Sequence, residues 1–472
     1  MNLLLALLFL TVPGLLPALA IVGVTPQAVF LPLLLGASLA AFAAVGELVV
    51  GGSIATWYIG WVVAAQVLSI LALWNKRRAR RDIAPVPGEH GGSRRKGGSI
   101  RLWEVMATVL IVAVALVPLS ALKARLVGYD AHYIWVLHGI FISGGHHQLL
   151  ADLKNPVYLF TNVDYPPLLP AASALGFFVV GRVDYGVAVA ITAVLNASAL
   201  GLLASGFTQI GRRLGTTRAR ISVSIVAAAL CWAGFGIAGS FAVNGYADLL
   251  WAAAATAAVV YGLVLPRSKT NVLVAEVGAL VAALTKNEGL VAALIILALV
   301  SLRHFSGDPS TLRRWFRVVT TMVVLAIPTL IWAVAIRLEG LKRNVAGPAA
   351  AQSHGFRLAS SISGLSAFLH IVPAALFVLM LGAILLRATR RWAGIGNPAW
   401  LWIALFVWLA ALLSTYTFGS FEIAWWIRTS AERTAIFPQL LLCSELAIWA
   451  VLAIEPRRPQ SPGSNAEPPR LQ

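Results

Sequence analysis

Asp130 is the residue whose surroundings are most typical of a catalytic acid or base. Apolar residues at 133, 134, 136, 137, 140 and 141 follow it with helical spacing. Asp130 is therefore predicted to stand at the start of an amphipathic helix that can lie in a membrane interface. A carboxylate in that place can accept a proton as a general base. The alternative interpretation is an aspartate that only caps the helix.

Four further segments place ionisable side chains close to the ends of apolar runs. They contain Asp164 with Tyr165 before two prolines, Asp248, the pair Lys286 and Glu288, and the group Arg428, Glu432 and Arg433. Cations of this kind, arginine above all, bind phosphate groups. Each segment can also be read as a helix cap, an interfacial anchor or an ion pair between helices. Ionisable residues at membrane depth are costly, however, so a functional role is the default hypothesis.

The histidines and cysteines do not predict a metal centre. His132, His138, His146 and His147 follow Asp130, but they lack tight ligand spacing on one helix face. They are interpreted as hydrogen-bonding or interfacial residues, with a divalent metal as the alternative. Cys231 and Cys443 both lie inside apolar runs and indicate neither a disulfide framework nor a metal site.

Apolar runs long enough to cross a bilayer must position these residues. The chain is 59% hydrophobic and 11% charged, which is typical of an all-α polytopic membrane protein and not of a soluble domain. Its apolar runs predict about 13 spans of the length that crosses a hydrocarbon core. They lie near residues 2–22, 27–50, 54–74, 102–121, 187–207, 221–240, 247–265, 271–286, 288–302, 318–336, 361–386, 398–417 and 433–454.

The distribution of Lys and Arg predicts the orientation of these spans. Residues 76–101 form a basic loop that is predicted to be cytoplasmic and, over 85–98, disordered. This puts the N-terminus outside, the C-terminus inside, and most other Lys and Arg in cytoplasmic loops. The net charge of +18 is thus mainly a topology signal. Because the basic residues are scattered over several loops, no nucleic-acid partner is predicted.

With this orientation the candidate residues fall on the outer side. The outer loop from about 122 to 186 contains an apolar piece, 166–180, that is short for a span and is predicted to be a juxtamembrane or re-entrant element. The predicted divisions are three extra N-terminal spans (1–75), the basic loop (76–101), a transmembrane core (102–454) and a disordered cytoplasmic tail (455–472). The first run has no positive residue before it, so it is interpreted as a span and not as a signal peptide.

The order of these motifs resembles the GT-C superfamily of membrane glycosyltransferases, in the family 39-related branch of protein mannosyltransferases and aminoarabinose transferases. The matching features are an acid in the first large outer loop (Asp130), an aromatic-Pro-Pro-Leu element (165–168), an acid at an outer span end (Asp248), a Lys two residues before an acid (286–288) and a Thr-Ser-x-x-Arg stretch (429–433). The likeness covers residues 100–450. The chain departs from the family in its three extra N-terminal spans, its single acid at 130 and its short tail in place of a soluble C-terminal domain.

The resemblance implies transfer of a sugar from a polyprenyl-phosphate donor to a hydroxyl acceptor on the outer face of the plasma membrane. It implies Asp130 as the general base, with Asp164 as the second catalytic candidate. Substrate binding is expected from His132, Trp135, Tyr165, Asp248, Lys286, Glu288, Arg428, Glu432 and Arg433. The expected partners are the bilayer, the lipid-linked donor and a cell-envelope glycan, lipid or protein acceptor, and no cofactor is expected.

Two other classes of protein stay open. A transporter or flippase of lipid-linked or polar solutes would show internal repeats and charges near the bilayer midplane. No repeat is visible, and most of the charges on the outer side map to span ends, with Glu445 inside the last span as the exception. A non-catalytic membrane scaffold would not need acids and cations that converge on one face.

Overall fold

The computed structural model describes residues 2–81, 101–120, 122, 128–212, 216–305, 311–341, 362, 382, 399–418 and 423–454. Over these residues the chain is helical and contains no β-strand, as the apolar runs predict. The predicted loop segment 85–98 and the predicted tail 455–472 lie outside the described residues. So does the predicted span 361–386, apart from positions 362 and 382.

The helices follow the predicted runs closely. In the first part of the chain they are α1 (Asn2–Val22), α2 (Gln27–Val50), α3 (Ile54–Arg81), α4 (Leu102–Leu119), η2 (Ala131–Val136), α5 (Leu137–Ser143), α6 (His146–Lys154), η3 (Pro156–Thr161), α7 (Leu168–Val180) and α8 (Tyr185–Gly211). The others are α9 (Thr217–Ala238), η4 (Gly239–Ala242), α10 (Asp248–Val259), η5 (Val260–Val264), α11 (Lys269–Thr285), α12 (Asn287–Phe305), α13 (Thr311–Leu338), α16 (Ala399–Phe418), α17 (Ile423–Thr434) and α18 (Ile436–Ile454).

Eight helices in the described part of the chain are long and apolar enough to cross a membrane. They lie at Asn2–Val22, Gln27–Val50, Ile54–Ala79, Leu102–Leu119, Tyr185–Gly211, Thr217–Ala242, Ala399–Thr417 and Ile427–Val451. These helices indicate an integral membrane protein. The predicted spans 247–265 and 271–286 correspond to shorter helices, α10 with η5 and α11, because both runs end after 17 residues.

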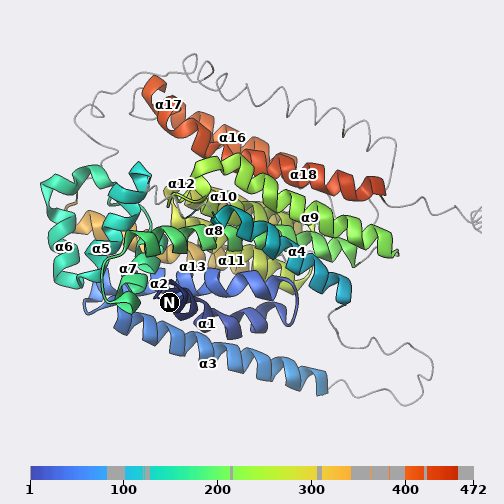
Figure 1. Cartoon of the computed structure of the whole chain (residues 1–472), viewed down its shortest axis with the longest axis horizontal. Coiled ribbons are helices and arrows are strands. Elements are labelled where there is room, and N and C mark those ends of the chain that lie inside the picture. Colours follow the sequence, from blue (N-terminus) through green and yellow to red (C-terminus); the bar gives the residue numbers. More distant parts are fainter. Residues whose placement is uncertain are drawn as a thin grey trace, which may run out of the picture.

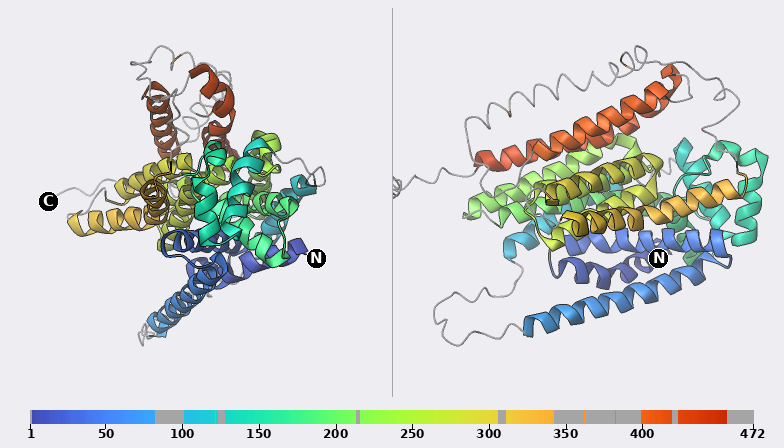
Figure 2. Two further views of the ribbon diagram at one scale, coloured as in Figure 1. Left: turned by 90° about the vertical axis from the view of Figure 1, so that its left-hand side faces the viewer. Right: turned by 180° about the vertical axis from the view of Figure 1, so that it is seen from behind.

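The centre of the bundle is formed by α2, α8 and α10. Every residue of α10 is buried, which explains why its sequence is apolar all round instead of striped. At the periphery, α3 lies along one edge and α16 with α18 along the opposite edge (Figures 1 and 2). Their exposed apolar side chains, such as Trp61 on α3 and Phe406 on α16, belong where a bilayer would cover them.

The helices run along the long axis of the molecule, so their ends gather at two opposite ends (Figure 1). One end carries α5, α6 and the start of α17. The other carries the beginning of α4, where Arg212 Nε lies 2.5 Å from Glu104 Oε1 and joins α8 to α4. The segment between the fourth and fifth predicted spans therefore sits at the end away from this Arg–Glu pair.

The predicted short element at 166–180 is helix α7, which begins directly after Pro167. Residues 168–177 are all buried, and α7 packs against α2, α5 and α1. The predicted amphipathic helix after Asp130 is also present, but it is divided into a π-helical turn, η2, and the short helix α5. Helix α7 contacts both η2 and α5, so it packs against the helical stretch that follows Asp130.

The three N-terminal helices are not all appended to the outside of the bundle. A Cβ on Gly14 would lie 1.9 Å from Pro32 O, so α1 and α2 approach each other at backbone distance. Gln27 Nε2 on α2 donates to Ser205 O on α8 at 3.0 Å. Helix α3 continues to Arg81, so the predicted division at residue 75 falls within a helix.

Candidate active site

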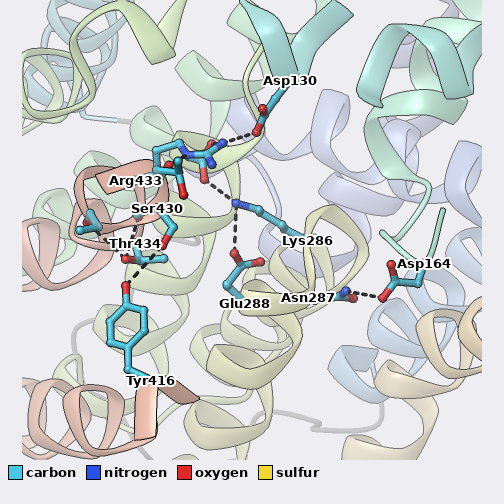
Figure 3. Close-up of polar contacts among 12 residues, drawn as sticks. Asp130, Asp164, Lys286, Asn287, Glu288, Tyr416, Ser430, Arg433 and Thr434 are labelled. Carbon is cyan, nitrogen blue, oxygen red and sulfur yellow. Dashed lines mark hydrogen bonds and ion pairs between the residues drawn. The ribbon is translucent and has the colours of Figure 1, made fainter. Parts of the chain in front are cut away.

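Five charged side chains from four separate segments meet at the end of the bundle that carries α5 and α6. We call this group the ionic cluster; it consists of Asp130, Asp248, Lys286, Glu288 and Arg433. Figure 3 shows Arg433 directed at Asp130, and Lys286 directed at Glu288. All five residues were predicted from the sequence as candidate site residues, and in the structure they contact one another.

The contacts of the ionic cluster form a continuous chain. Lys286 Nζ lies 2.8 Å from Asp248 Oδ1 and 3.1 Å from Glu288 Oε1. Arg433 Nη1 donates to Asp130 Oδ2 and lies 3.9 Å from Asp248 Oδ2. Asp248 therefore joins the two cations, and Asp130 and Glu288 stand at the two ends of the chain.

Asp130 and Asp248 are brought together by backbone packing between two short segments. Gly128 N donates to Asn244 O at 3.0 Å, and a Cβ on Gly128 would lie 2.0 Å from the Tyr246 ring. Gly245 adopts a φ of +89° opposite Ala131, in a conformation that favours glycine. The segment with Asp130 and the turn before Asp248 are thus held in direct contact.

Lys286 is positioned by a sharp break between two helices. Its backbone is extended, with φ −157° and ψ 154°, so α11 ends at Thr285 and α12 begins at Asn287. A Cβ on Gly289 would lie 2.0 Å from Ala282 O, so this corner requires glycine. The Lys-Asn-Glu-Gly motif is therefore a helical corner that directs Lys286 into the bundle and leaves Glu288 partly exposed.

Arg433 lies in the last turn of α17. Its Nε donates to Thr429 O at 3.1 Å, and its guanidinium carbon lies 5.6 Å from the centre of the Tyr246 ring. Helices α17 and α18 meet at the buried Ala435, and the candidate span Ile427–Val451 runs across this junction, so it begins before the predicted bound of 433. Arg433 thus lies in α17, within the first part of this span, and reaches the cluster beside α10.

The structure contradicts the helix-capping interpretation of Asp130. Asp130 occupies the N-cap position of η2, but its side chain makes no capping hydrogen bond. The carboxylate instead points to Arg433, which is 303 residues away in the chain. Asp130 therefore serves the ionic cluster and not the start of its own helix.

An aromatic pair lines the ionic cluster. The ring of Tyr165 stacks on Trp135 at 5.2 Å, and Lys286 Nζ lies 5.8 Å from the Tyr165 ring centre. Burial, together with the charge of Glu288, raises the pKa of Tyr165 above its usual range, so the hydroxyl stays protonated. Trp135 is 2% exposed, and its buried ring packs against one face of the Tyr165 ring.

Asp164 lies beside the cluster without joining it. It is 7% exposed, and its Oδ2 accepts from Asn287 Nδ2 at 3.3 Å. Figure 3 shows this pair to the right of Glu288, away from Arg433 and Asp130. Asp164 therefore contacts the corner that carries Lys286, and its catalytic role stays a prediction.

Three other predicted residues do not enter the cluster. Arg428 and Glu432 are exposed on α17, and among the described residues neither makes an ion pair with the cluster. His132 stacks on Tyr185 at 4.9 Å instead. His138 is 2% exposed and bonds Thr161 Oγ1 through Nε2 at 2.9 Å, and burial lowers its pKa to about 4. No group of three metal-ligating side chains occurs among the described residues.

Exposure separates the roles of the carboxylates. The side chains of Asp248 and Lys286 are 1% and 3% exposed, whereas Asp130 and Glu288 are 19% and 28% exposed. The buried pair is thus a fixed ionic centre, and Asp130 and Glu288 are the more accessible carboxylates of the cluster.

Two residues of the site were not singled out from the sequence. Tyr246 lies under Arg433, and Asn287 binds Asp164. Their positions beside Asp248 and Lys286 were visible in the motifs, but neither residue type signals chemistry by itself.

No family model matches the chain, and neither a curated protein nor a solved structure matches it.

Proposed function

We propose that this chain is a membrane glycosyltransferase that transfers a sugar from a polyprenyl-phosphate donor to a hydroxyl acceptor. The observation that carries the proposal is the contact between Arg433 and Asp130 within the ionic cluster. It places a cation suited to phosphate against an accessible carboxylate suited to a general base. The motif order that resembles the GT-C superfamily supports the same reaction.

In the proposed step the acceptor hydroxyl oxygen attacks the anomeric carbon of the donor. Asp130 takes the hydroxyl proton as the new carbon–oxygen bond forms. The bond between the anomeric carbon and the phosphate oxygen breaks, and the lipid phosphate leaves with the electron pair. Arg433, with Lys286 behind it, stabilises the charge that develops on this phosphate. Glu288, the more exposed end of the cluster, is available to bind sugar hydroxyls.

Binding of the donor phosphate also frees the Asp130 carboxylate to act as the base. Both cations of the cluster are already paired with carboxylates, so a donor phosphate must compete with Asp130 for Arg433. When the phosphate takes Arg433, the Asp130 carboxylate is released to meet the acceptor hydroxyl. We therefore expect an ordered reaction in which the donor binds before the acceptor.

The orientation of the chain belongs to the same proposal. With about 13 spans, an outer N-terminus and an inner C-terminus in the plasma membrane, the ionic cluster lies at the outer face. Single cysteines test this in a background with Cys231 and Cys443 replaced. Gln148→Cys on α6 should react with an impermeant thiol reagent in intact cells, and Ser93→Cys should be shielded. The reverse labelling pattern would overturn both the topology and the outer-face site.

The reaction itself is tested by transfer from radiolabelled polyprenyl-phosphate sugars. Purified protein in lipid nanodiscs is incubated with a panel of such donors and with cell-envelope fractions, and label is followed from lipid into aqueous or bound product. Protein with Asp130→Asn and Arg433→Ala together is the control for background transfer. Equal transfer by both proteins with every donor would refute the proposal.

A transporter or flippase is the second candidate, because the buried pair Lys286 and Asp248 lies at an interrupted helical corner. The two functions differ in the fate of the donor. A transferase releases free lipid phosphate in nanodiscs, where no second compartment exists. A flippase leaves the lipid-linked sugar intact and moves it only across a sealed vesicle.

A further inference from the structure

An exposed strip of aromatic rings begins at the residues on either side of Asp130. We call it the aromatic strip; it consists of Tyr129, His132, Tyr133, Phe160 and Tyr185. Tyr129, Tyr133 and Phe160 are 65%, 38% and 41% exposed. The strip is thus a surface feature, unlike the buried stack of Trp135 and Tyr165.

The rings of the aromatic strip form an unbroken path. Tyr185 stacks on His132 at 4.9 Å with an interplanar angle of 20°, and His132 meets the edge of Tyr133 at 4.5 Å. Tyr133 in turn contacts Tyr129 at 4.7 Å and Phe160 at 5.8 Å. Because the rings come from the start of η2 and the residues just before it, from η3 and from the start of α8, three parts of the chain converge to build one surface.

The chemistry of the strip is selective. It offers ring faces together with three tyrosine hydroxyls and an imidazole, and none of its five members carries a fixed charge. Sugar rings have an apolar C–H face that packs on aromatic rings, and hydroxyl edges that exchange hydrogen bonds with tyrosine and histidine. A surface of this kind suits a neutral carbohydrate.

We propose that the aromatic strip is the acceptor platform and that the acceptor is a neutral carbohydrate chain. The inference rests on the proposed glycosyl transfer. The strip begins beside the base in the chain, since Tyr129 directly precedes Asp130 and His132 follows two residues later. A sugar stacked on the strip presents its terminal hydroxyl toward the Asp130 carboxylate while the lipid phosphate occupies Arg433.

A membrane interface is the competing occupant of such a surface, because tyrosines are enriched in interfacial belts. The mixed ring orientations and the closeness of the strip to a charged cluster favour a carbohydrate instead. The two occupants differ in one measurable respect. A belt contributes to membrane insertion and needs no soluble ligand, whereas a platform binds sugar in solution.

The test measures carbohydrate binding without donor and without turnover. Full-length protein in nanodiscs is titrated with maltoheptaose, cellopentaose and mannopentaose, using saturation-transfer NMR and calorimetry. The variants are Tyr133→Ala and the double variant Tyr133→Ala/Phe160→Ala. The matched controls are Val157→Ala, an exposed apolar residue on η3, and Trp232→Ala, an exposed ring on α9.

We expect at least one of the three oligosaccharides to bind. The double variant should weaken that binding by about tenfold or more, equivalent to about 1.4 kcal/mol, and both controls should leave it unchanged. In transfer assays the same double variant should raise the acceptor KM while donor affinity and kcat stay close to wild type. All variants should insert into membranes at wild-type levels.

Several results would overturn the inference. These are the failure of all three oligosaccharides to bind, binding that the double variant does not weaken, or a loss of membrane insertion in that variant. If sugar binds to the strip but no donor is ever turned over, the platform stands and the proposed transfer falls. If transfer proceeds with an unchanged acceptor KM in the double variant, the transfer stands and the platform falls.

Discussion

Replacing Asp130 with asparagine should change transfer and donor affinity in opposite directions. Asparagine keeps the shape of the side chain, but it cannot take a proton. Transfer should therefore fall by about 100- to 10,000-fold, the range for loss of a general base. Since the Asp130 carboxylate makes no capping hydrogen bond, the fold should lose only the contact of this carboxylate with Arg433.

The rise in donor affinity follows from the contact with Arg433. The two side chains are 19% and 16% exposed, so their pairing should lie between the small value of a surface ion pair and that of a fully buried one. A pair worth about 1.4 kcal/mol leaves Arg433 free for about a tenth of the time, so removing the competing charge should tighten phosphate binding about tenfold.

The assay separates binding from chemistry. Binding is measured with a polyprenyl phosphate that carries no sugar, and transfer is measured with the radiolabelled donor. Asp184→Asn is the matched control, because Asp184 is an acid at the same end of the bundle whose Oδ1 accepts from Val187 N, and asparagine caps equally well. The control should leave both quantities close to wild type.

Three results would refute this reasoning. If Asp130→Asn transfers sugar within a fewfold of wild type at equal expression, Asp130 is not the base. If transfer instead collapses in Glu288→Gln and not in Asp130→Asn, the base is the other accessible carboxylate of the ionic cluster. Unchanged or weaker phosphate binding by Asp130→Asn would show that Asp130 and the donor do not compete for Arg433.

Further predictions concern the cations and the buried histidine. Arg433→Lys should already impair transfer, because a point charge does not reproduce the planar fork, whereas Arg428→Lys on the exposed face of α17 should be mild; equal effects in a transfer assay would remove the phosphate role from Arg433. Lys286→Met should destabilise the protein by about 3–5 kcal/mol, because it leaves Asp248 charged in the interior, and adding Asp248→Asn should recover much of this. Thermal denaturation in one detergent measures both, and a single variant as stable as wild type would contradict the buried pair. The pKa of His138 is about 4 in the folded protein, below its ordinary value of 6.5, so folding stability should be lost as the pH falls from 6.5 toward 4. His138→Gln should lose less stability over that window, and parallel acid denaturation curves for the two proteins would argue against a neutral buried imidazole.

Much of the helical framework could be predicted from the sequence. The runs 2–22 and 27–50 coincide with α1 and α2, because a helix that crosses a bilayer must satisfy its backbone internally over a set length. The last span could not be placed as well. It was predicted over 433–454, whereas α17 ends at Thr434, α18 begins at Ile436, and the apolar span Ile427–Val451 crosses both helices.

The choice among the candidate site residues was decided by packing. One short motif contains Arg428, Glu432 and Arg433. Their different angular positions around α17 direct Arg433 toward Asp130 and leave the other two exposed. Asp164 and Asp130 both lie in the predicted outer loop, yet one binds Asn287 and the other binds Arg433. Local spacing cannot distinguish such cases, because the partner lies on another segment.

The sequence by itself determined that this protein is helical and embedded in a membrane, and it identified the motifs that contain ionisable residues. Those conclusions depend on composition and on the length of apolar runs, which are local properties of the chain. Only the tertiary structure decided that Asp130 pairs with Arg433, 303 residues away, and that Asp248 and Lys286 form the buried centre between them. The reason is physical: these contacts depend on close approaches between segments far apart in the sequence, such as Gly128 against Tyr246, which no periodicity in one segment can encode.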